Sequence, residues 1–273
     1  MSIPARPLRN LLPASLLVPA LLLGGCSSEG ATEPGTPTSA PASSPAGEPA
    51  VQLPSVELPD SAGPLVDTIS GRVKEAGSVH AEITAQGEGA EKGSGDLRTD
   101  TASPALRLTI SGSPPTEAVV LDGVVYARTE GEEIEPGKPW AKLSRDEIPA
   151  EPAEVKQMLT ALLDGVESAL REISVDTGLD IVRKGRLKGD PSEENLDGTQ
   201  VRRYEGETDA SKLTEQKFKG SGAVGWTLWV GMDGLPRRFY AVLKDSDFTV
   251  DYSRWGVPVT IEAPPANQVS TIS

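Results

Sequence analysis

The sequence has almost none of the residues from which metal sites and nucleophilic active sites are usually built. Its 273 residues include one cysteine and one histidine, which excludes Cys/His zinc clusters and Cys–His catalysis within one chain. A Ser-His-Asp triad has only His80 available, and no G-x-S-x-G elbow is present to supply its serine. We therefore expect no enzyme, no metal site and no cofactor, and we interpret His80 as a surface residue.

Clustered positive charge is also scarce. The chain has 26 Lys and Arg against 40 Asp and Glu, a net charge of −14, and no Lys/Arg run longer than a pair. Nucleic-acid binding needs clustered cations that release counterions, so we exclude it. One local basic concentration, expected to form a solvated strand face, comprises Arg183, Lys184, Arg186, Lys188, Arg202 and Arg203.

The N-terminus has the pattern of a targeting segment. Arg6 and Arg9 precede an apolar run over 11–23, which is too short and too rich in proline for a membrane-spanning helix. The run ends in Leu23-Gly24-Gly25-Cys26, which resembles the bacterial lipobox. This resemblance implies a signal peptide over 1–25, lipidation of Cys26, and anchoring on the extracytoplasmic face of the cell membrane. An ordinary secretory signal with a free Cys26 is the alternative.

The rest of the chain divides into a tether, a domain and a tail. Residues 26–60 are rich in Ser, Ala and Pro and contain no aromatic residue. Such a composition buries too little apolar surface to fold, so a disordered tether is expected. We place one domain over 61–266 and a flexible tail over 267–273.

The domain has three helical patterns among many strand patterns. Apolar residues four apart predict a helix over 61–76 with Gly77 as its stop. Apolar residues spaced by three and four predict a longer helix over 155–173, and a short helix is expected at 176–182. Strands are predicted over 79–86, 104–111, 117–122, 124–129, 247–253 and 257–262.

Three Asp-Gly pairs indicate hairpins, at Asp122-Gly123, Asp197-Gly198 and Asp233-Gly234. With few helices and many strands, the sequence predicts an α+β fold made of one antiparallel sheet with helices on one face. A sheet of about ten strands curls around the helices that cover it. These helices are too few to fill the concavity, so an apolar cavity between sheet and helices is expected.

A series of short segments resembles the LppX/LprG-type lipoproteins of actinobacteria, which are relatives in fold of the LolA lipoprotein carrier. Besides the lipobox, the segments are Ser78–His80, Gly95–Arg98, Asp122–Tyr126, Trp140–Leu143, Asp197-Gly198 with Arg203-Tyr204, Leu228–Val230 with Asp233–Pro236, and Trp255–Pro265. The resemblance covers almost the whole domain. It implies a half-barrel sheet wrapped over helices, and a cavity for the acyl chains of an envelope lipid or glycolipid that is carried toward the outer envelope, with a lipid exporter as a possible partner.

The candidate cavity wall consists of apolar residues that equally suit an ordinary core. These residues are Ile83, Leu106, Leu108, Ile110, Met158, Leu162, Val166, Leu170, Leu228, Val230 and Val242. Two functions stay open, a lipid or glycolipid carrier and an envelope lipoprotein that binds a protein partner or senses the envelope with a closed cavity. An enzyme is a distant third, since paired carboxylates are not excluded in a chain with 40 acids.

Overall fold

A computed structural model describes residues 53–87, 92–99, 105–148, 156–157, 160, 163, 174–213, 222–243 and 246–271. The signal peptide and most of the tether lie outside these residues. Of the predicted helix 155–173, only residues 156, 157, 160 and 163 are described, and all four are helical. Met158, Leu162, Val166 and Leu170 lie outside the described residues.

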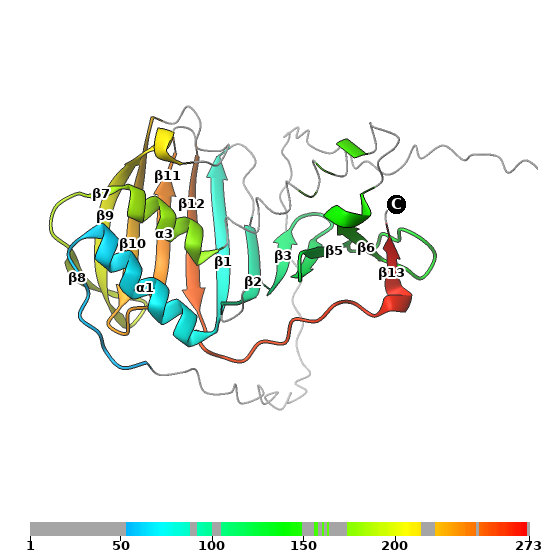
Figure 1. Cartoon of the computed structure of the whole chain (residues 1–273), viewed down its shortest axis with the longest axis horizontal. Helices are drawn as coiled ribbons and strands as arrows, with labels where there is room; N and C mark the ends of the chain where they lie inside the picture. Colours follow the sequence, from blue (N-terminus) through cyan, green and yellow to red (C-terminus); the bar gives the residue numbers. More distant parts are fainter. Residues whose placement is uncertain are drawn as a thin grey trace, which may run out of the picture. The chain divides into compact units, whose positions relative to one another are not determined.

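One large, curved and unclosed sheet forms the body of the described chain (Figure 1). Its strands are β1 (Ser78–Gly87), β2 (Lys92–Arg98), β3 (Ala105–Ser111), β4 (Thr116–Leu121), β5 (Val124–Thr129), β6 (Trp140–Ser144), β7 (Arg186–Leu187), β8 (Ser192–Leu196), β9 (Thr199–Asp209), β10 (Ala223–Gly231), β11 (Pro236–Val242), β12 (Ser246–Ser253) and β13 (Val269–Thr271). They follow the order β13-β6-β5-β4-β3-β2-β1-β12-β11-β10-β9-β7, with β8 also paired to β9. All the described pairs are antiparallel except β13 with β6. The predicted α+β half-barrel is therefore confirmed.

The predicted Asp-Gly hairpins occur as expected. Asp122 and Gly123 have φ of 52° and 76°, and Asp197 and Gly198 have φ of 52° and 86°. Two consecutive positive φ values match the twist of a two-residue hairpin, and glycine adopts the second without strain. At Asp233, the side-chain Oδ1 accepts a hydrogen bond from the Leu235 backbone N–H at 3.1 Å and so shapes the third turn.

Helices α1 (Ala62–Ala76) and α3 (Val175–Lys184) lie against each other on one face of the sheet, over β1, β12, β11 and β10 (Figure 1). Gly77 ends α1 with a left-handed φ of 80°. At the start of α3, the Ser174 hydroxyl accepts a hydrogen bond from the Asp176 N–H. The periodicity therefore predicted both helices correctly. We call the face they cover the helix side of the sheet, and the opposite face the outer side.

The core between these helices and the sheet is closely packed. The Trp226 ring of β10 lies directly on Gly206 of β9, where a Cβ atom would overlap the ring. Its Nε1–H donates to the Thr208 hydroxyl at 3.0 Å, and that hydroxyl donates to the Ile181 carbonyl of α3 at 2.6 Å. The missing side chain at Gly206 thus lets a large ring fill the core while its polar nitrogen stays satisfied.

The last strand was predicted wrongly. Residues 257–262 form no strand; they run extended across the outer side, where Val259 and Ile261 pack against Val119 and Trp140. The apolar residues of this segment do alternate, but they pack against the face of the sheet and form no backbone pairing with another strand. We call residues 257–268 the strap. The strap leads to β13. Residues 269–271, expected to belong to a flexible tail over 267–273, are therefore part of the sheet.

The start of the domain also lies earlier than expected. Leu58 is buried, and Leu53 and Val56 pack against the same core. The Val56 N–H donates to the Met232 carbonyl at 2.9 Å, and Arg202 donates to the Leu58 carbonyl at 2.7 Å. Residues 53–60 are therefore docked onto the domain and are not part of the tether, because their apolar side chains and backbone groups find partners there.

Candidate functional site

The helix side of the sheet is an apolar surface that continues across eight strands. Residues directly opposite one another on neighbouring strands share a face. One such row runs Tyr204, Leu228, Phe239, Val250, Ile83, Gly93, Ile110 and Thr116. This surface is the candidate site for an acyl chain, because a continuous apolar wall is what such a ligand requires.

The structure brings most of the described cavity candidates to this surface. Ile83, Leu106, Leu108, Ile110, Leu228 and Val230 all belong to the apolar cluster on the helix side. Val242 does not, and this prediction was wrong. It pairs with Asp247 and Gly225 on the outer side and is 41% exposed, because the alternation of β11 points Phe239 and Ala241 inward instead.

The two halves of the helix side are covered by different parts of the chain. α1 and α3 cover β1 and β12 to β9, where Leu228 is 2% and Val230 0% exposed. Over the other half, Leu163 is fully buried against Val125 and Leu143. Leu228 and Val230 therefore sit in a packed core, whereas Ile83 and Ile110 are only partly buried between the two covered regions.

Strand β2 lies between the two covered regions and has two glycines on its helix side. Gly93 and Gly95 both face the helix side, opposite Ile83 and Ala81 of β1. A Cβ atom at Gly95 would come within 2.5 Å of the Arg107 carbonyl oxygen of β3. Glycine is thus required for the close approach of these two strands, and it leaves β2 without bulky side chains at positions 93 and 95, although Leu97 on the same face is buried in the core.

Two buried tyrosines place phenol hydroxyls on the helix side. Tyr204 is 0% exposed, and its hydroxyl has no hydrogen-bond partner among the described residues. The Arg202 guanidinium lies over the ring, 5.7 Å from its centroid. Burial raises the pKa of Tyr204 to about 12. Burial also raises the pKa of Tyr252 on β12, with smaller contributions from the carboxylates of Asp176 and Asp251. Both phenols therefore stay neutral at ordinary pH.

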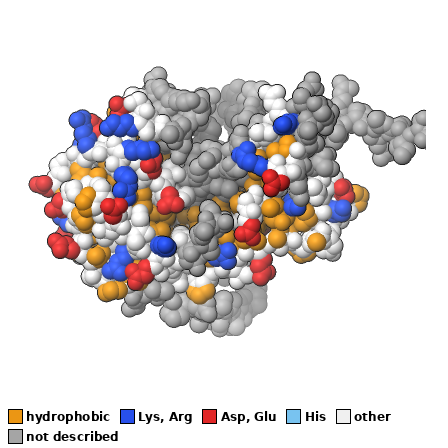
Figure 2. Space-filling model, viewed as in Figure 1, with side chains coloured by type: hydrophobic (Ala, Val, Ile, Leu, Met, Phe, Trp, Pro, Cys, Tyr) orange, Lys and Arg blue, Asp and Glu red, His pale blue; other side chains and the backbone are white. Residues whose placement is uncertain are grey.

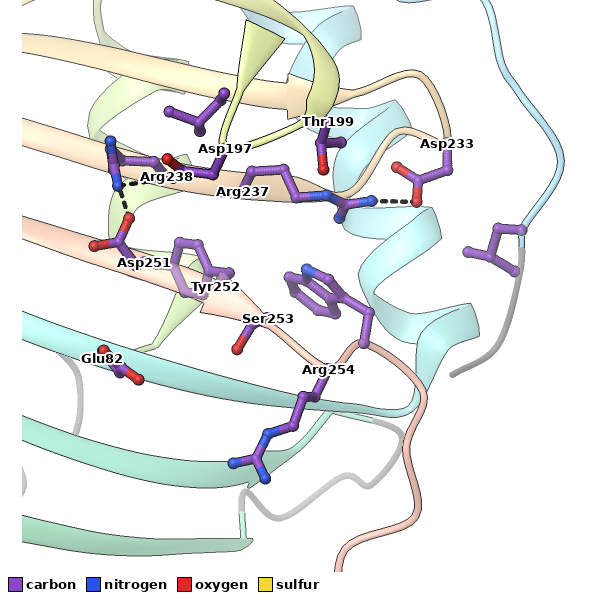
Figure 3. Close-up of a pocket in the computed structure, with 13 residues that line it drawn as sticks. Glu82, Asp197, Thr199, Asp233, Arg237, Arg238, Asp251, Tyr252, Ser253 and Arg254 are labelled. Atoms are coloured by element: carbon purple, nitrogen blue, oxygen red, sulfur yellow. Dashed lines mark hydrogen bonds and ion pairs between the residues drawn. The ribbon is translucent and has the colours of Figure 1, made fainter. Parts of the chain in front are cut away.

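The outer side carries a polar pocket of about 720 Å³, which we call the outer pocket (Figure 3). Its lining comes from β1, β11 and β12, from the β8–β9 and β10–β11 turns, and from Leu53 of the docked segment. Asp251 and Asp197 both point at Arg238, with 2.5 Å and 3.6 Å between the nearest atoms, and Asp233 lies 2.5 Å from Arg237. Sequence reasoning missed this pocket, because it depends on how the tip of one hairpin lies against strands distant in the chain.

His80 lies beside the outer pocket, and its described side-chain partners are carboxylates and not a serine nucleophile. Its Nδ1 is 2.7 Å from an Asp96 carboxylate oxygen, and its Nε2 is 3.7 Å from the Glu82 carboxylate. Ser253 is its cross-strand neighbour on β12, yet no hydrogen bond joins the two. The side chain is 16% exposed, so His80 is less open to solvent than we expected of a surface residue. Across the described ranges, no three His, Cys, Asp or Glu side chains gather in a geometry for a metal ion.

All six basic residues singled out in the sequence form ion pairs, with five carboxylates between them. Arg183 pairs with Asp67, Lys184 with Asp180, Arg186 and Lys188 with Glu207, Arg202 with Asp60, and Arg203 with Glu205. Figure 2 shows acidic and basic side chains interspersed over the described surface of the helix side. The expected strand face holds only in part, because Arg183 and Lys184 lie on α3 while Arg186, Arg202 and Arg203 lie on strands. The paired charges offer no focused positive field for an anionic head group.

No helix in the described part of the chain is long and apolar enough to cross a membrane. No family model and no curated protein matches the sequence.

Among solved structures, the chain is similar to the lipoprotein LppX of Mycobacterium tuberculosis, at 14% identity and a TM-score of 0.50, over 73% of this chain and 98% of that one. It is also similar to LprF of Mycobacterium bovis, at 18% identity and a TM-score of 0.47, over 74% of this chain and 96% of that one. The curved sheet with its helices on one face is thus the fold of the mycobacterial lipoprotein LppX.

Proposed function

We propose that this protein is a membrane-anchored, extracytoplasmic lipoprotein that binds the acyl chains of an envelope lipid or glycolipid on the helix side of its sheet and carries the lipid toward the outer envelope. The observation that carries the proposal is the row of facing residues across eight strands, which is apolar from Leu228 to Ile110 and ends in Thr116. Binding of this kind needs apolar volume for the tails and polar groups only at its mouth. It needs no nucleophile or metal.

The acyl chains are assigned to the half of the helix side formed by β2 to β6. The other half is filled by α1 and α3, which leave Leu228 and Val230 fully enclosed. Ile83 and Ile110, only partly buried, lie at the boundary, next to the glycines of β2. The wall of the proposed site is therefore centred on the partly buried Ile83 and Ile110, beside Leu106 and Leu108, which are buried. Met158, Leu162, Val166 and Leu170 are the proposed opposite wall.

The test is native mass spectrometry of the full chain carrying Cys26→Ser, purified from its own host and then extracted with organic solvent. A bound acyl lipid that is released by extraction supports the carrier. An empty domain would favour the other class of function, a protein-binding or sensing lipoprotein, and would contradict the proposal.

Two adjacent residues of β3 provide matched variants. Ile110 is partly buried on the helix side, and Thr109 is exposed on the outer side. Ile110→Trp should displace the acyl chain and reduce lipid occupancy several-fold, while the melting temperature of the lipid-free protein changes little. Thr109→Trp should leave both quantities unchanged. Equal lipid occupancy in the two variants would contradict the placement of the acyl-binding site on this surface.

A further inference from the structure

The outer pocket is lined by four carboxylates and three arginines, together with apolar side chains. The charged residues are Glu82, Asp197, Asp233 and Asp251 together with Arg237, Arg238 and Arg254. Its volume of about 720 Å³ is in the range of small-molecule sites. We infer that the outer pocket binds an uncharged, hydroxyl-rich ligand of the neutral oligosaccharide class.

The pairing of the arginines argues against an anionic ligand. Arg238 Nε lies 2.5 Å from Asp251, Arg237 lies 2.5 Å from Asp233, and Arg254 lies 3.2 Å from Asp96. A phosphate or carboxylate is recognised by guanidinium groups that are not already neutralised. In this pocket such an anion would have to displace carboxylates of the protein that are already in place. An anion would therefore have to compete with these carboxylates for the guanidinium groups.

The same pairing suits a sugar. A sugar hydroxyl both donates and accepts, and here carboxylate oxygens alternate with guanidinium N–H groups along one wall (Figure 3). Glu82 keeps a carboxylate that is 68% exposed, and the hydroxyls of Thr199 and Ser253 also line the space. Hydrogen bonds to charged groups are stronger than neutral ones. Leu53 and Leu196 supply apolar surface for the C–H faces of a ring.

The register separates this site from the proposed acyl site. Glu82, Asp251 and Arg238 form a cross-strand row that alternates with Ile83, Val250 and Phe239, so the two rows face opposite sides of the sheet. A sugar in the outer pocket therefore neither needs nor displaces an acyl chain. The inference stands independently of the proposed function.

The test measures binding of neutral trisaccharides to the full chain with Cys26→Ser. Maltotriose, mannotriose and cellotriose are the probes, measured by saturation-transfer NMR and calorimetry, with inorganic phosphate and trilysine as charged probes. We expect at least one trisaccharide to bind with a dissociation constant of about 1 mM or below, with little dependence on salt. No saturation transfer to any of the three, or tighter binding of phosphate or trilysine, would overturn the inference.

Variants locate the site. Arg238→Gln and Glu82→Gln should each weaken trisaccharide binding about tenfold or more, as expected when a charged hydrogen-bond partner is lost. If Arg238→Gln lowers the melting temperature, Glu82→Gln still tests the site, because the Glu82 side chain is 68% exposed and its substitution should not affect folding. Arg128→Gln is the control, since Arg128 is also an outer-side, ion-paired arginine but lies on β5, outside the pocket. Lipid occupancy should be the same in all three variants. Equal affinities for the trisaccharide would place any sugar site elsewhere.

Discussion

At the scale of single residues, the contact of Trp226 with Gly206 makes a sharp prediction. A methyl group at Gly206 would overlap the indole ring, which is 3% exposed and held by its hydrogen bond to Thr208. Gly206→Ala should therefore lower the free energy of unfolding by about 1–3 kcal/mol, as overpacked cores do. Denaturant unfolding measures this. Gly225→Ala is the control, because a Cβ atom there meets nothing within 4 Å, and it should be neutral.

The buried hydroxyl of Tyr204 predicts a dependence of stability on alkaline pH. Its folded pKa of about 12 lies above the ordinary value of 10, so the folded state holds its proton where the unfolded state has lost it. The contribution of Tyr204 to the free energy of unfolding should therefore be fully present below pH 10, and stability should fall as the pH rises from 10 toward 12. Tyr204→Phe should reduce this slope, with the remainder due to Tyr252. At neutral pH it should not destabilise, since the hydroxyl has no described partner. Urea unfolding at several pH values checks both expectations.

At the scale of elements, the strap holds the outer side of β3 to β6. Ile261 is 6% exposed and packs with Val119 and Trp140, while Thr260 beside it points to solvent. Ile261→Ala should cost about 2 kcal/mol or more of stability. Thr260→Ala should cost almost nothing. Unfolding followed by tryptophan fluorescence tests the pair, and equal stabilities would mean that the strap is not anchored by Ile261.

The elements also separate what sequence can predict from what it cannot. The Asp122-Gly123 hairpin and the Gly77 helix end depend on local backbone geometry, and both follow from the residue types. The strap looks like a strand because it alternates, but whether alternating residues pair or pack depends on distant partners. The alternation of β3 places Ile110 on the helix side, and the alternation of β11 places Val242 on the opposite face, so that error concerned a local pattern. The outer pocket was not foreseen because it depends on strands that are distant in the chain.

At the scale of the whole molecule, Cys26 is predicted to carry the lipid anchor. Cys26→Ser should leave the folded domain intact and release the protein from the membrane, because the proposed acyl groups are its anchor. Phase partitioning and the mass of the purified protein check this against the unaltered chain. A Cys26→Ser protein that partitions into membranes like the unaltered chain would contradict the predicted lipidation.

The position of β1 in the middle of the sheet has a consequence for how the chain folds. β1 pairs with β2 on one side, but its other neighbour is β12, so His80 lies opposite Ser253. Loops that join such distant residues close slowly, and folds dominated by them reach the native state slowly. A chain that emerges N-terminus first therefore leaves one edge of β1 unpaired until residue 253 has emerged, and folding is completed only after nearly all of the chain is available.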